Sequence, residues 1–191
     1  MRVINESATE STYDLLSEPL IGTLLLPEYI PTLGLAPMSS LVQEFAATLL
    51  RHIALQLPTD FTGLGVVFYE NLDALPFIAL EVSASQKIRL PVNGIKDIAS
   101  TLAWASSAMS DWHDGFHFVD VSKQQLTHLA QFLSPPLPQN GEPAPKASGA
   151  RHMTAMLSTR VEGIVGIGLL THGHELAFFE RGAQTLRETI Q

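Results

Sequence analysis

The sequence predicts a mixed α/β (α+β) domain, in which helices flank a central, twisted, mixed β-sheet. Apolar runs of strand length alternate with segments of helical periodicity, as expected of a sheet with helices on its faces. The polar stretches "HDG", "GARH" and "THGH" fall at the ends of predicted elements, where binding sites are usually built. With 191 residues, 46% of them hydrophobic, the chain can bury a substantial core.

Two parts of unequal length are predicted. Residues 1–36 begin with a polar, acidic stretch, and Pro27 and Pro31 interrupt regular structure, so we interpret this part as an N-terminal extension. Residues 37–191 are expected to form a single domain. We find no apolar signal region behind a basic start and no apolar run of membrane-spanning length, so we expect a cytoplasmic protein without a membrane partner.

The first half of the domain is predicted to hold a helix, three strands and a second helix. Leu41, Phe45 and Leu49 repeat at helical spacing in the first helix, which ends at Leu57 before a proline. The strands are expected at residues 64–69, 77–82 and 87–90, and the first is apolar enough to be central. Asn93-Gly94 precedes the second helix, expected to run to about residue 109.

The second half continues the alternation of elements. Ser122 and Gln125 have the spacing of a capping box, which predicts a helix up to residue 133. The proline-rich residues 134–148 predict an exposed loop. The remaining predicted elements are a strand at 116–120, a short helix at 149–158, a hairpin of strands at 163–170 and 174–180, and a helix at 183–191.

Composition excludes several classes of function. The net charge of −8 and the pI of about 5.2 argue against a protein that coats DNA or RNA duplexes, which needs a basic face. A small anionic ligand requires only a positive field in its own pocket. The chain has no cysteine, which excludes disulfides, thiolate metal sites and cysteine nucleophiles.

Two motifs and their order carry a resemblance to a known family. "HDGFHFVD", followed after a proline-rich stretch by "GARHMTAMLSTRVEGIVGIGLL", resembles the nucleotide-binding domain of diadenylate cyclases, which make the bacterial signal cyclic di-AMP from two ATP molecules. That family carries an Asp-Gly-Ala motif, often after a histidine, and a Gly-Thr-Arg-His-Arg motif. The similarity covers roughly residues 61–182 and implies a diadenylate-cyclase-like domain with a role in signalling.

The resemblance also implies roles for particular residues. Asp114 would be the catalytic aspartate, which assists metal binding and deprotonates the attacking hydroxyl. The implied nucleotide contacts are Asp114, Gly115, Phe116, Gly149, Ala150, Arg151, His152 and Ser158. Mg²⁺ or Mn²⁺ would be held by His113, Asp114 and His172. Because the cyclases work with two chains facing each other, a homo-oligomer is implied as well.

Several positions depart from the family pattern. Phe116 replaces the small alanine, Met153 replaces the second arginine, and His172 stands where a metal-binding glutamate is expected. Methionine cannot replace the bidentate phosphate contact of an arginine. We therefore expect impaired catalysis, with anion binding retained by Arg151 and by the backbone at a helix N-terminus near Gly149.

Three hypotheses follow, in this order. The first is a sensor-like domain that binds an adenine or cyclic nucleotide, such as ATP, without cyclase activity. The second is an active metal-dependent diadenylate cyclase, and the third is a structural partner protein with a vestigial pocket. Several of these residues also have interpretations without a functional site. Asp114-Gly115 is an ordinary turn dipeptide as well. His117 is expected to be exposed or satisfied by a hydrogen bond, and His172 and His174 are expected to be solvated.

Overall fold

The structure is a computed structural model that describes residues 38–82, 87–139 and 146–190. The described residues belong to one compact unit. The N-terminal extension, residues 1–36, lies outside them, so the proposed division of the chain stays a prediction. None of the helices in the described ranges is long and apolar enough to span a bilayer.

In the described ranges three helices and eight strands follow each other in an order close to the predicted one. They are α1 (Met38–Ala54), β1 (Gly63–Tyr69), β2 (Phe77–Ala79), β3 (Val92–Asn93), α2 (Ile95–Ala105), β4 (Phe116–Asp120), β5 (Gln125–Leu133), α3 (Ala150–Ser158), β6 (Ile164–Thr171), β7 (Glu175–Glu180) and β8 (Ala183–Thr189).

All eight strands join one mixed sheet in the order β2-β5-β4-β1-β6-β7-β8, with β3 paired to β5. Strands β1 and β4 are parallel, and the other pairs are antiparallel. As the sequence indicates, β1 is central and every residue in it is buried. The predicted mixed sheet flanked by helices is confirmed.

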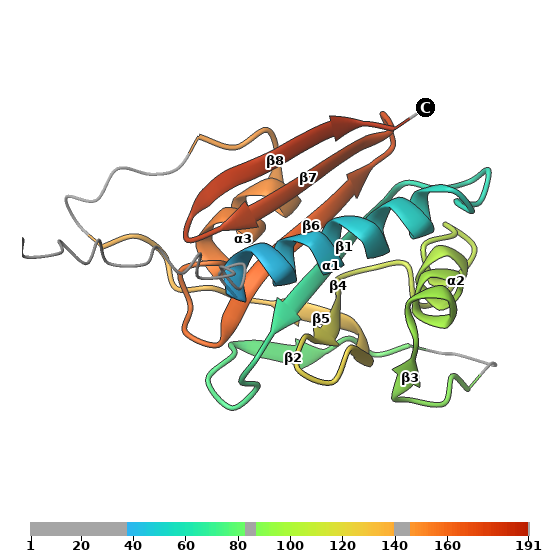
Figure 1. The fold of residues 1–191 in the computed structure, drawn as a ribbon, viewed down its shortest axis with the longest axis horizontal. Coiled ribbons are helices and arrows are strands. Elements are labelled where there is room, and N and C mark those ends of the chain that lie inside the picture. Colours follow the sequence, from blue (N-terminus) through green and yellow to red (C-terminus); the bar gives the residue numbers. More distant parts are fainter. Residues whose placement is uncertain (1–37, 83–86, 140–145, 191) are drawn as a thin grey trace, which may run out of the picture. The chain divides into compact units, whose positions relative to one another are not determined.

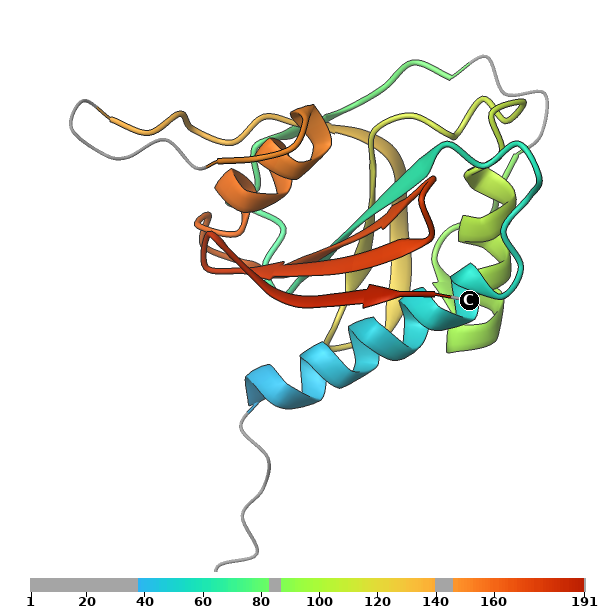
Figure 2. The same ribbon diagram turned by 90° about the horizontal axis from the view of Figure 1, so that it is seen from above.

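The helices cover both faces of the sheet. Helices α1 and α2 lie on one face and α3 on the other (Figures 1 and 2). Alternate side chains of β1 divide between the two cores: Leu64, Val66 and Phe68 pack toward α1 and α2, while Val67 and Tyr69 pack on the α3 side. The alternation is what a strand buried on both faces requires.

Three expected elements have another structure, and two end earlier than expected, β2 at Ala79 and α2 at Ala105. Residues 87–90 are not a strand, and pairing begins at Val92, after Pro91, which has no N–H to donate. The predicted helix up to residue 133 is instead β5, and Ser122 uses its hydroxyl to donate to the carboxylate of Asp120 in the turn before it.

The expected terminal helix is the edge strand β8. The turn at Arg181-Gly182, where both residues have positive φ, sends the chain back along β7. In this strand Leu186 and Glu188 are partly buried while Arg187 is exposed, which is the alternation of a half-covered strand. The spacing of four between Leu186 and Ile190 fits a strand as well as a helix, and the hairpin decides between them.

Candidate functional site

The polar stretches that the sequence singles out meet at one end of the sheet. Because β1 and β4 are parallel, Phe61, which precedes β1, and Asp114, which precedes β4, lie at the same end. Strand β6 runs antiparallel to β1 and pairs its last residue, Thr171, with Gly63, so His172 follows at that end too. The topology thus assembles segments that are more than a hundred residues apart.

A cavity of about 330 Å³ lies between this end of the sheet and α3. Its walls come from both predicted motifs and from β5: Gly115, Phe116, Gln131, Phe132, Leu133, Ala150, Arg151 and Thr154. The volume is at the lower end of the range usual for small-molecule sites. The "HDGF" and "GAR" motifs therefore border one cavity.

Gly115 shapes one wall because its backbone lies against β5. Its φ is +79°, a left-handed conformation that favours glycine. A Cβ added there would come within 2.6 Å of the carbonyl oxygen of Gln131. The glycine after Asp114 is therefore required by the fold, whatever the site binds, and it leaves the Asp114 side chain exposed at the cavity edge.

Phe116 contributes a buried ring to the cavity. A Cβ added to Gly65 on β1 would lie 2.6 Å from this ring, so the ring rests directly on the strand backbone. Phe116 is only 6% exposed and belongs to the core on the α3 side. The residue that replaces a small alanine of the family pattern thus fills space beside β1.

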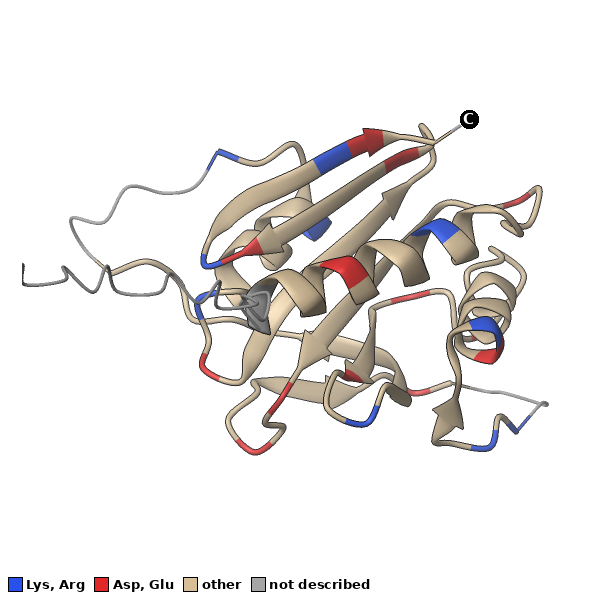
Figure 3. Ribbon diagram, in the orientation of Figure 1, with Lys and Arg blue, Asp and Glu red and all other residues tan. Residues whose placement is uncertain are grey.

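Arg151 is the charged residue among those that line the cavity. Its guanidinium lies against Gly63, where a Cβ would collide with Nη1. Burial lowers the pKa of Arg151, and the nearby carboxylate of Asp114 opposes that shift. Charged residues elsewhere are spread over several elements (Figure 3), and Arg151 is the cation available to an anion in this cavity, with the Asp114 carboxylate nearby.

The N-terminus of α3 borders the same cavity. Gly149 is its N-cap, and no described side chain caps the helix or places an acidic group in its first turn. The first N–H groups of a helix have no partner within it and carry partial positive charge. They add donors for an anion beside Arg151.

Two of the predicted nucleotide contacts lie away from this cavity. His152 points to the other side of α3, where its ring meets the ring of Phe179 edge-on at 5.4 Å. Ser158 is fully buried at the opposite end of α3, and its hydroxyl has no partner among the described groups. The motif "GARH" therefore divides its side chains between two faces of the helix.

The predicted metal ligands are only partly brought together. His113 Nδ1 donates to the carbonyl of Ser110, and His172 Nδ1 donates to the carbonyl of Phe61 at 2.9 Å, which leaves each Nε2 free to bind. His113 Nε2 lies 3.8 Å from the Asp114 carboxylate. Strand β1 separates β4 from β6, however, which places their backbones about 10 Å apart.

Within the described ranges no three His, Asp or Glu side chains are grouped so that they could hold a metal ion. The predicted set of His113, Asp114 and His172 does not fit a three-ligand site in this conformation.

Sequence reasoning missed the contribution of β5. Gln131 and Phe132 line the cavity, but that segment was predicted as a helix. His117, expected to be satisfied or exposed, is fully buried; its Nδ1 accepts a hydrogen bond from the N–H of Ala130, and its Nε2 has no partner among the described groups. Trp112, just before the "HDGF" motif, packs against the core on the α1 side.

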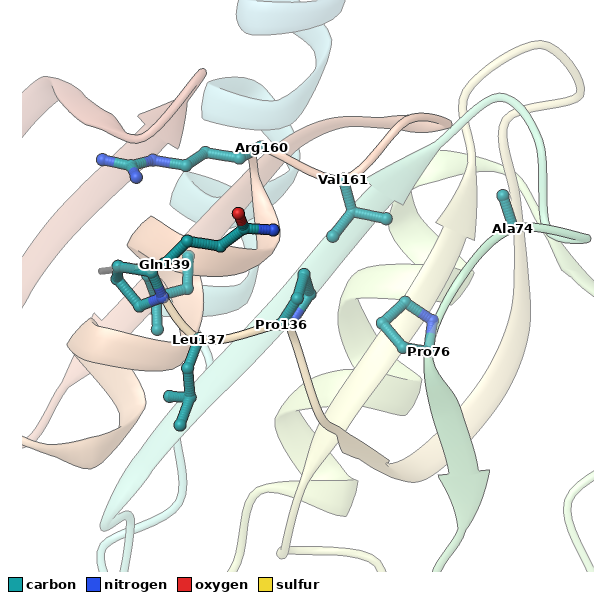
Figure 4. A pocket seen from close by; sticks show the side chains of 9 residues that line it. Ala74, Pro76, Pro136, Leu137, Gln139, Arg160 and Val161 are labelled. Atoms are coloured by element: carbon teal, nitrogen blue, oxygen red, sulfur yellow. The ribbon is translucent and has the colours of Figure 1, made fainter. Parts of the chain in front are cut away.

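A larger cavity of about 560 Å³ lies beside residues 134–139 (Figure 4). Its lining is mostly proline and aliphatic, with Pro76, Pro136 and Val161 on its walls and Arg160 and Gln139 toward one side. None of the predicted site residues lines it. Residues 134–139 form no helix or strand, in agreement with the predicted loop, and residues 140–145 lie outside the described ranges.

The fold and the site define a mixed α/β domain with a candidate anion-binding cavity at one end of its sheet. No family model matches the chain, and no curated protein matches it. Among solved structures, a hypothetical membrane-spanning protein from Bacillus cereus is similar with a TM-score of 0.49 and 19% identity, over 78% of this chain and 63% of that one.

A double mutant of DacA from Staphylococcus aureus is similar with a TM-score of 0.47 and 14% identity, over 80% of this chain and 88% of that one. This chain spans less than two thirds of the Bacillus cereus protein. Both TM-scores lie below 0.5, so the likeness is distant and does not say what this chain binds.

Proposed function

We propose that the domain binds a small phosphorylated ligand, an adenine or cyclic nucleotide, in the cavity between Gly115 and Arg151, and that it acts as a sensor without cyclase activity. The observation that carries the proposal is the convergence of a partly buried arginine, an uncapped helix N-terminus and a close-packed glycine turn on one cavity. The arginine and the helix N-terminus are features by which proteins bind phosphate, and the glycine turn forms a wall of the cavity. The sequence motifs of the diadenylate cyclases support the choice of a nucleotide.

The test is a thermal-shift screen of the purified protein against AMP, ATP, GTP, cyclic di-AMP and inorganic phosphate, each with and without Mn²⁺. A ligand that binds the native state raises the melting temperature, and the rise grows with the logarithm of its concentration relative to its Kd. We expect stabilisation by at least one adenine nucleotide. Stabilisation by none of the compounds would contradict the proposal.

Arg151→Ala is expected to weaken the binding of that nucleotide roughly ten- to a hundredfold, because one charge-assisted hydrogen bond to phosphate is lost. Calorimetric titration of wild type and variant measures the change. Lys96→Ala is the matched control, since it removes one exposed positive charge from α2, which covers the other face of the sheet. Equal affinities of wild type and Arg151→Ala would place the phosphate elsewhere.

Incubation of the protein with ATP and Mn²⁺ is expected to yield no cyclic di-AMP above background. Phosphoryl transfer needs positive charge around the moving phosphate, and Met153 supplies none where the family pattern has an arginine. Mass spectrometry of the reaction mixture detects the product. Its formation by wild type and its loss in Asp114→Asn would instead establish an active diadenylate cyclase.

A further inference from the structure

Strand β5 carries a bulge directly opposite His117. Phe116 of β4 pairs with Gln131 and Phe118 with His128, so two steps along β4 correspond to three along β5. The extra residue places Ala130 at a φ of +50°, a left-handed conformation that residues other than glycine rarely adopt. Such a backbone persists only where its surroundings hold it.

Two side chains satisfy the backbone groups that the bulge leaves unpaired. The N–H of Ala130 donates to His117 Nδ1 at 3.2 Å, and Gln131 Nε2 donates to the carbonyl of Leu129. His117 is fully buried in β4, so its ring is fixed by packing. Because Nδ1 accepts this bond, the imidazole proton must lie on Nε2.

The bulge in turn supports the turn that carries Asp114. Gly115 packs on the backbone of Gln131. A Cβ added to Gly115 would lie 2.6 Å from the Gln131 carbonyl oxygen. Gln131 also lines the cavity beside Arg151. A shift of Gln131 therefore moves the support of Gly115 and one wall of the cavity together.

We propose that His117 is a positioning residue of the ligand site: through Nδ1 it holds the β5 bulge, and the bulge seats the Asp114-Gly115 turn against the cavity. Its effect on ligand affinity rests on the proposed function, while its hydrogen bond to Ala130 can be tested without a ligand. A leucine would fill the space but leave the buried N–H of Ala130 without an acceptor. An asparagine would keep an acceptor at the same position along the side chain.

The first experiment measures the tautomer of His117 in wild-type protein by ¹⁵N NMR at neutral pH. We expect a protonated Nε2 and an unprotonated Nδ1 that is coupled through a hydrogen bond to the Ala130 amide. A proton on Nδ1 would exclude that bond and overturn the proposal, whether or not any variant folds.

The second experiment compares His117→Leu, His117→Asn and Val119→Ala, a control at a fully buried position of the same strand. In His117→Leu we expect the amide signals of Ala130 and Gly115 to shift, faster hydrogen exchange at Ala130, and roughly tenfold weaker binding of AMP, as for supporting groups behind other sites. His117→Asn should retain slow hydrogen exchange at Ala130 and the wild-type affinity. Val119→Ala should lose stability but not affinity.

The outcomes separate the two proposals. If wild type binds neither AMP nor inorganic phosphate, the proposed function fails, and the tautomer and the Ala130 amide still decide the role of His117. If His117→Leu folds with unchanged Ala130 and Gly115 signals, the positioning role is wrong. It is equally wrong if His117→Asn speeds hydrogen exchange at Ala130 as much as His117→Leu does.

Discussion

Acidification from pH 7 to pH 4 is expected to remove about 3 kcal/mol of folding free energy through His117 alone. Burial, and secondarily the positive charge of Arg151, lower the pKa of His117 from 6.5 to about 3 in the folded protein. The ring cannot gain a proton without leaving the core or carrying a charge into it. The unfolded chain has no such restriction.

The sign follows from the protons that each state binds. Between pH 6.5 and pH 3 the unfolded chain takes up a proton on His117 and the folded protein does not. Acid therefore favours unfolding, and the contribution is fully present above pH 6.5. Each pH unit in this window costs about 1.4 kcal/mol, so the loss approaches about 5 kcal/mol near pH 3.

Urea unfolding at pH 7, 6, 5 and 4 measures this loss. His117→Asn should show a much flatter dependence on pH, because the titrating group is gone while the acceptor for Ala130 is kept. His128→Gln is the matched control: burial lowers the pKa of His128 as well, but its ring is only partly buried, so most of the acid loss should remain. If the free energy of unfolding of His117→Asn fell with pH as steeply as that of wild type, other groups would be the cause of the acid sensitivity.

Gly115→Ala is expected to destabilise the protein by about 2–4 kcal/mol. The substitution combines a positive φ with a Cβ placed 2.6 Å from the carbonyl oxygen of Gln131, and strand backbone cannot move aside as a flexible side chain can. Relief requires that the Asp114-Gly115 turn or β5 shift. Both border the cavity, so ligand affinity should fall with stability.

Chemical denaturation measures the change, and Gly173→Ala is its control. Gly173 also lies in a turn, but the nearest atom to an added Cβ, Thr171 Oγ1, is 3.8 Å away. Its substitution should leave the free energy of unfolding nearly unchanged. If both variants lost stability equally, the close contact of Gly115 with β5 would not be the cause.

Much of the fold could be predicted because burial leaves a regular pattern. The seven residues of β1 are all buried, and the sequence there is almost wholly apolar. Helix α1 repeats its apolar residues at helical spacing and buries the later ones, Leu49 and Ile53, while Leu41 near its start is exposed. Where an element packs on the sheet along its whole length, the spacing of its apolar residues is sufficient to predict whether it is a helix or a strand.

β5 could not be predicted because a bulge interrupts the regular burial pattern of this strand. Leu126 and Leu129 are three residues apart, which is helical spacing, yet both face the core on the α1 side. Irregular pairing in β5 changes the phase of the strand and brings them to one face. A bulge held by a side chain from another strand leaves no local signal in the sequence.

The site could be predicted in part. The motifs indicated Asp114, Gly115 and Arg151, and the structure places Gly115 and Arg151 in one cavity with the Asp114 carboxylate close by. His152 follows Arg151 in the sequence but lies on another face of α3. Neighbours in a motif share a function only if they also share a face of the helix, which the motif alone does not say.

The placement of β8 matters for aggregation when this strand opens. In the described part of the chain β8 forms one border of the sheet, and it carries Arg187 and Glu188, charges that discourage the addition of a foreign strand. The neighbouring strand, β7, has the sequence "LAFF" from Leu176 to Phe179, and these four residues are buried. Fraying or proteolysis of β8 would offer this uncharged segment, with its free backbone groups, as a template for aggregation. The last strand thus protects the protein from self-association as well as completing its sheet.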